Sequence, residues 1–100
     1  MATKTSERVA IENVVSPGRV VRVDAAKYEA MKKAMLAVLS TRAPGLTVAE
    51  LKESLLPRLP KQLFPGGAKA GWWLKAVQLD LEAKGIVDRE STKPLRLHRR

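Results

Sequence analysis

Residues 71–87 read GWWLKAVQLDLEAKGIV, and this stretch decides the fold. Apolar side chains recur in it at helical spacing and form two adjoining rows, which predicts an amphipathic helix over residues 68–84. Gly85 follows, in the position where glycine commonly ends a helix. Ile86 and Val87 then change the pattern to that of a strand. The sequence therefore predicts a helix that leads directly into a β-strand.

The residues after this helix predict a β-hairpin. Segments 86–90 and 95–99 both have strand character, and the sequence STKP at 91–94 between them is typical of a turn. We expect the hairpin to pair either with a strand near the N-terminus or with the stretch between the preceding helices.

Two further helices are predicted upstream. Asp24 is a good N-cap for an amphipathic helix over 24–39, because its carboxylate can accept hydrogen bonds from the first free amides. Thr47 and Glu50 have the spacing of a capping box, in which each side chain bonds to the other residue's amide. The helix that they begin is short, over 47–56, because Pro57 disfavours helical geometry at the residue before it.

The N-terminal residues 1–18 are predicted to form an extended arm, and 19–100 to form one domain that starts with a short strand over 19–23. Ile11, Val14 and Val15 are an apolar cluster in this otherwise polar arm. A small domain can exchange such an arm with a second copy, so we expect a homodimer held by the arm.

This order of elements predicts a mainly α fold with a small β-hairpin, a winged helix-turn-helix of three helices plus a wing. Three helices with a frayed tail, and a small α+β domain without DNA-reading geometry, are the alternatives. The 71–87 stretch resembles the corresponding part of many winged-helix domains. Together with PGR at 17–19, DAAKY at 24–28 and FPGG at 64–67, the chain from Ile11 onward also resembles a small family of uncharacterised bacterial proteins. That resemblance implies the fold but no function.

The chain is strongly basic, with 19 Lys and Arg against 10 Asp and Glu among its 100 residues. Residues 57–100 hold most of the surplus, with a net charge of +6. A basic domain attracts polyanions, nucleic acid first among them, although charge also serves solubility alone. The chain has no cysteine and no apolar run of the ~20 residues that span a bilayer, so we expect a cytoplasmic protein away from the membrane.

We expect double-stranded DNA as the partner. In winged helices the third helix enters the major groove and the wing contacts the backbone or the minor groove. Gly71 is expected to let a ligand's backbone approach, and Arg89 and Arg100 add charge to the wing. The side chains expected to contact DNA are Lys69, Lys75, Gln78, Lys93, Arg96 and Arg99. The alternative is a protein–protein interaction or dimerisation module with this fold and no nucleic-acid partner.

Three residues of the last helix and hairpin need a structural explanation. Trp73 is expected in the core and Trp72 at the seam between the helix and the hairpin, although an exposed Trp72 could instead be a stacking or partner-binding platform. Asp80 lies among apolar positions, and a buried carboxylate needs a partner. We expect Arg96 or His98 to supply it.

The sequence does not predict an enzyme, a metal site or a cofactor. His98 is the single histidine, and no serine lies in a nucleophile motif. The sequence PGGAK at 65–69 lacks the spacing of a phosphate-binding loop, so it is expected to be a flexible helix start.

Overall fold

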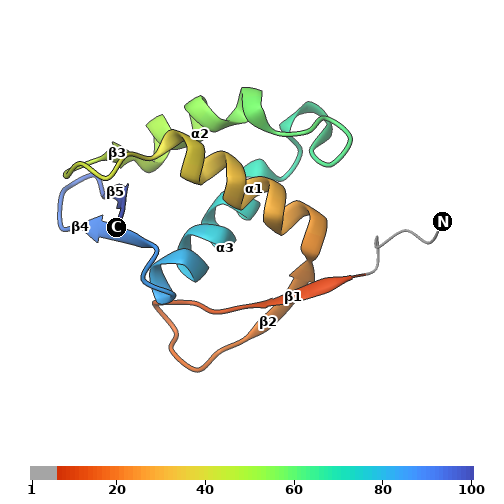
Figure 1. The fold of residues 1–100 in the computed structure, drawn as a ribbon, viewed down its shortest axis with the longest axis horizontal. Helices are drawn as coiled ribbons and strands as arrows, with labels where there is room; N and C mark the ends of the chain where they lie inside the picture. The colour runs from red at the N-terminus through yellow and green to blue at the C-terminus, as the bar shows by residue number, and fades with distance from the viewer. Residues whose placement is uncertain (1–6) are drawn as a thin grey trace.

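The structure is a computed structural model that describes residues 7–100, and this part of the chain forms three α-helices and two small antiparallel sheets (Figure 1). The helices are α1 (Ala25–Val38), α2 (Val48–Leu55) and α3 (Ala70–Ala83), close to the predicted bounds. The connection from α2 to α3 contains two short 3-10 turns, η1 (Leu56–Arg58) and η2 (Pro65–Gly67). No helix among the described residues is long and apolar enough to cross a membrane.

The N-terminal sheet is a hairpin of β1 (Arg8–Ile11) and β2 (Val21–Asp24). The strand predicted at 19–23 is therefore present slightly further along the chain. Residues 8–11, expected in an extended arm, are instead a paired strand, and residues 1–6 of that arm lie outside the described residues. Residues 8–11 form a strand because their backbone groups pair with those of β2. The polar composition of the arm does not indicate this pairing.

The C-terminal sheet has the strand order β3-β5-β4. Strand β4 (Val87–Glu90) and strand β5 (Arg96–Arg99) form the predicted hairpin, and β5 also pairs with β3 (Leu46–Thr47). Of the two pairings considered, the hairpin thus uses the stretch between α1 and α2. Gly45 permits this close approach, because its φ is +84° and an added Cβ would lie 1.9 Å from the Leu97 carbonyl oxygen.

Side chains at the predicted helix starts form the caps. The Asp24 carboxylate accepts a 2.9 Å hydrogen bond from the amide of Lys27. Thr47 and Glu50 form the complete capping box, with hydrogen bonds of 3.1 and 2.9 Å in the two directions. Both starts were predicted because capping depends on neighbouring residues alone.

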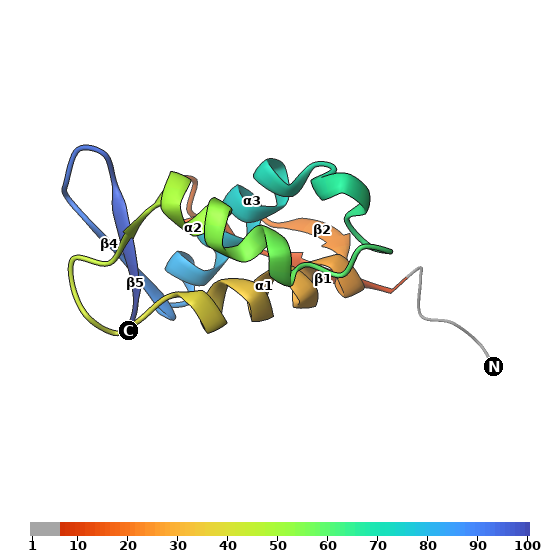
Figure 2. The same ribbon diagram turned by 90° about the horizontal axis from the view of Figure 1, so that it is seen from above.

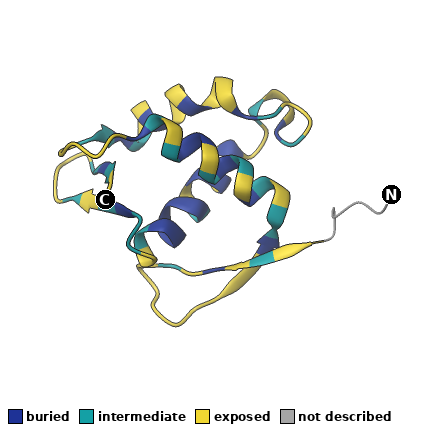
Figure 3. Ribbon diagram, viewed as in Figure 1, coloured by how far each residue is buried: buried dark blue, intermediate teal, exposed yellow. Residues whose placement is uncertain are grey.

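The core lies between α1 and α3 and is closed by α2 on one side and by the N-terminal hairpin on the other (Figures 1 and 3). Met31 and Met35 from α1 are fully buried, as are Leu74 and Val77 from α3. Trp73 is 7% exposed, as expected for a core residue. Seen from above, the C-terminal hairpin lies at one end of the helices (Figure 2).

Candidate nucleic-acid interface

The N-terminal half of α3 (residues 70–76) presents an open outer face. Gly71, Trp72 and Lys75 are exposed on it, and Trp72 keeps 57% of its surface accessible. In the C-terminal half (residues 77–83) the outer face is covered, because the segment that follows β1 lies against it. The amide of Val14 donates a hydrogen bond of 3.3 Å to the carbonyl of Leu79 there.

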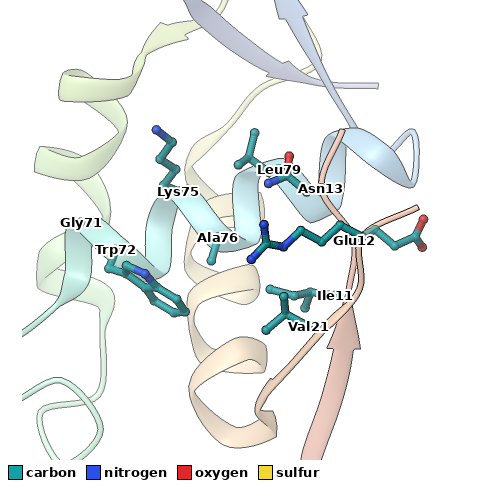
Figure 4. A pocket seen from close by; sticks show the side chains of 10 residues that line it. Ile11, Glu12, Asn13, Val21, Gly71, Trp72, Lys75, Ala76 and Leu79 are labelled. Carbon is teal, nitrogen blue, oxygen red and sulfur yellow. The ribbon is translucent and has the colours of Figure 1, made fainter. Parts of the chain in front are cut away.

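Two adjoining cavities run along the open face, and we call them together the α3 groove. The first, about 350 Å³, lies between α3 and the N-terminal hairpin (Figure 4). The second, about 560 Å³, lies between α3, α2 and the C-terminal hairpin. Both are lined by Asn13, Gly71, Lys75 and Leu79, so the cavities share a wall.

The α3 groove is electropositive. The second cavity is lined by Lys52 and Lys75, which make no ion pair with a described residue, and by no carboxylate. Arg89 also lines it, but its charge is paired with Glu82. A Cβ on Gly71 would lie 3.4 Å from the Lys52 ammonium, so this glycine gives room to a lysine from α2. Gly71 was predicted to let a ligand's backbone approach the helix. In the structure, the Lys52 side chain lies beside this glycine. Lys52 was not among the predicted contact residues. The only signal for it in the sequence is its position on α2, one turn beyond the cap.

The six predicted contact residues have different environments. Lys69, Lys75, Lys93 and Arg99 are exposed and make no ion pair with any described residue. Only Lys75 and Gln78 line the groove, and the other four residues lie outside its two cavities.

Gln78 and Arg96 are both engaged within the fold. Gln78, which was expected to contact DNA, is only 4% exposed, and its amide donates a 2.9 Å hydrogen bond to Glu82. The Arg96 guanidinium donates to the Gly45 carbonyl at 2.9 Å and lies 3.6 Å from Glu50. Arg96 therefore secures the joint between β5 and the start of α2.

All four carboxylates of residues 57–100 are in ion pairs within the described chain. Glu82 receives two hydrogen bonds from Arg89, of 2.5 and 3.0 Å, and Asp88 is paired with Arg100 at 2.7 Å. The hydrogen bond from Arg100 lowers the pKa of Asp88. The two arginines expected to add charge to the hairpin are thus largely neutralised by neighbours. The surplus in this region rests on the cations outside such pairs, which are Arg58, Lys61, Lys69, Lys75, Lys93 and Arg99.

His98 belongs to the hairpin and is paired across it. Its Nε2 lies 2.8 Å from the Glu90 carboxylate, and its Nδ1 lies 3.0 Å from the Arg99 carbonyl. Contact with the Arg99 carbonyl and the Glu90 carboxylate raises the pKa of His98 above its usual value. The residue therefore joins β4 to β5 and does not reach α3.

Asp80 is fully buried, as expected, but the prediction of its partners was wrong. Its carboxylate accepts hydrogen bonds from the Tyr28 hydroxyl at 2.5 Å and from the amide of Glu12 at 2.8 Å, and it is paired with Lys84. Arg96 and His98 are engaged elsewhere. Asp80 therefore joins α3 to α1 and to the N-terminal hairpin, on the side opposite to the one predicted.

Trp72 also differs from its predicted place at the seam with the C-terminal hairpin. It lines the first cavity with Ile11 and Val21 of the N-terminal hairpin (Figure 4). Its ring packs nearly perpendicular to Trp73, with centroids 5.0 Å apart and an interplanar angle of 82°. Trp72 is therefore exposed and does not pack at that seam.

Comparison with known proteins identifies a family only. No curated protein and no solved structure is detectably similar to the chain. Residues 8–97 match the model of a family of unknown function, DUF6958, and the chain therefore belongs to that family.

Proposed function

We propose that this chain is a winged-helix protein that binds DNA through the open half of α3 and the C-terminal hairpin, which acts as the wing. Lys75 and Lys93 contact phosphates, with Lys69 and Arg99 as further cations. Gln78 has no part in reading bases, because it is buried and bonded to Glu82.

The observation that carries the proposal is the set of cations that make no ion pair within the described chain. Four of the five cations expected to contact DNA lie outside every ion pair of the described chain. Lys75 is exposed on the open half of α3, and such a cation can approach a phosphate without first losing a partner among the described residues. The element order and the strand order β3-β5-β4 are compatible with a winged-helix layout.

The test is a salt series of binding to a blunt DNA duplex. We expect Lys75→Ala and Lys93→Ala each to weaken binding to every duplex sequence and to reduce the slope of log affinity against log salt by about 1. Lys33→Ala is the matched control, because Lys33 is an exposed lysine on α1 outside the groove. Unchanged affinity and slope in both test variants, or the same loss in the control, contradicts the proposal.

One observation favours the alternative, a protein-interaction or dimerisation module. Five of the six exposed large apolar side chains lie in or beside the N-terminal hairpin, namely Val14, Val15, Val20, Val21 and Trp72. Ile11, which was also expected to mediate dimerisation, is buried in its own domain at 7% exposure. The connection from α2 to α3 is also longer than the turn of three or four residues in a helix-turn-helix.

Sedimentation of the same samples separates the two functions. Concentration-dependent dimers that Val15→Asp abolishes, with no DNA binding at low salt, support the interaction module. A monomer that binds duplex with a steep salt dependence supports DNA binding.

A further inference from the structure

We propose that the first cavity of the α3 groove binds an unpaired nucleotide of the DNA, with its base stacked on Trp72. This inference rests on the proposed function and specifies the ligand at the same site: duplex DNA with an adjoining single-stranded segment.

The exposure of Trp72 is the first reason. A large aromatic ring that is 57% exposed loses the free energy that burial would provide, and the chain holds only four aromatic residues. Trp73 at 5.0 Å, nearly perpendicular, restrains the ring beside the cavity. A restrained ring is a preorganised stacking surface, because little side-chain entropy remains to be lost on binding.

The cavity has the size and lining for one base. Its volume of about 350 Å³ falls within the range of small-ligand sites, about 300–1,000 Å³. Ile11, Val21 and Ala76 supply apolar surface, as the flat faces of a base require (Figure 4). Asn13 lies at the opposite end of the lining from Trp72 and carries polar atoms toward which base edges can turn.

The charges around the cavity fit a nucleotide's phosphates. Arg19 and Lys75 line it, and neither makes an ion pair with a described residue. Lys75 extends from α3 away from Ile11 and Val21, at the rim where a backbone would pass (Figure 4). Glu12 is the single carboxylate in the lining, and its side chain points away from Trp72 (Figure 4). An aromatic surface flanked by cations is the usual arrangement for binding single-stranded nucleic acid.

The short length of the open face of α3 favours an unpaired strand over a second stretch of duplex at this point. The segment after β1 covers the C-terminal half of the helix, where Val14 is hydrogen-bonded to Leu79. Only the first two turns of α3 are therefore open to a ligand. A single strand can follow this short face and place one base beneath the N-terminal hairpin.

The experiment compares two partial duplexes of equal charge. Both carry a six-nucleotide 3′ overhang, which is thymidine in one and abasic in the other. We expect the native chain to bind the thymidine overhang about 10-fold more tightly, since base stacking contributes roughly 5- to 150-fold in affinity. Trp72→Leu, which keeps an apolar side chain without the ring, should reduce this ratio to about one, while Trp72→Phe should retain most of it.

The outcomes separate this inference from the proposed function. If the native chain binds the two overhangs equally, or if Trp72→Leu keeps the preference, base stacking on Trp72 is wrong, while duplex binding through Lys75 and Lys93 can still hold. If Lys75→Ala and Lys93→Ala leave blunt-duplex binding unchanged, the proposed function is wrong. A thymidine preference that depends on Trp72 would even then support the stacking site. Failure to bind blunt duplex and both overhangs overturns both ideas.

Discussion

The two halves of α3 use the same kinds of residue in opposite ways. In the C-terminal half, Gln78 and Asp80 are buried and every charged side chain is paired. In the N-terminal half, Trp72 is exposed, and Lys75 is exposed and makes no ion pair with any described residue. Charges and aromatic groups that hold the fold together are not available to a ligand. The open half is therefore where we place the function, and the closed half is where replacing a polar or charged side chain should cost the most stability.

The largest effect is expected from the two adjacent tryptophans. Trp73→Ala should reduce the free energy of unfolding by about 4 kcal/mol, because it leaves a cavity in the core beside Phe64. Trp72→Ala should cost less than about 1 kcal/mol, since a surface substitution removes little buried area. Denaturant melts of both variants measure the difference. Equal losses would show that Trp72 is held in the core, and the open face would then not exist.

The closed half is tested by its buried carboxylate. Asp80→Ala should cost about 3 kcal/mol, because it leaves the Tyr28 hydroxyl and the Glu12 amide without an acceptor and Lys84 without its partner. Lys75→Ala in the open half is the matched control and should leave the melting curve close to that of the native chain. A neutral Asp80→Ala would mean that the N-terminal hairpin is held to α3 by other contacts.

The local parts of the fold could be predicted from the sequence, because their causes are local. The Thr47–Glu50 capping box, the Asp24 cap and the helix-to-hairpin passage at Gly85 all depend on residues close together in the chain. For pairing between strands that are far apart in the sequence, only a set of alternative partner strands could be predicted. Pairing of β5 with β3 was one of two options, and β1 was missed because its partner β2 lies ten residues further along the chain.

The candidate site was predicted less well, for a related reason. Helical periodicity assigns residues to faces, but it does not show which face a distant segment will cover. The segment after β1 lies against the C-terminal half of α3, where the Glu12 amide donates its hydrogen bond to Asp80. In the same half, Gln78 is buried and bonded to Glu82. Arg96 was expected to contact DNA or to pair with Asp80. The Gly45 carbonyl that it binds instead is 51 residues away in sequence, which local patterns do not indicate. The exposure of Lys75 could be predicted from its place in the helical pattern, and that of Lys93 from the turn at 91–94.

The Tyr28 hydroxyl, the link from α1 to the closed half of α3, is expected to contribute less stability than Trp73 or Asp80. Burial and the hydrogen bond to Asp80 raise the pKa of this phenol well above its usual value. A raised pKa in the folded state means that the stabilisation is fully present below the unfolded value of about 10 and is lost as the pH rises above it. Tyr28→Phe should cost about 2 kcal/mol at neutral pH, because it removes a hydrogen bond to a charged group.

The pH dependence separates this hydrogen bond from loss of packing. Tyr28 is the only tyrosine in the chain, so the native protein should lose more stability than Tyr28→Phe as the pH rises above about 10. Lys32 and Lys84, whose ammonium groups each lie 5.9 Å from the Tyr28 ring centre, are present in both proteins, so their contributions largely cancel in the comparison. Urea melts at several pH values give the two curves. Parallel curves would contradict the phenol–carboxylate link, and the closed half of α3 would then owe its stability to packing alone.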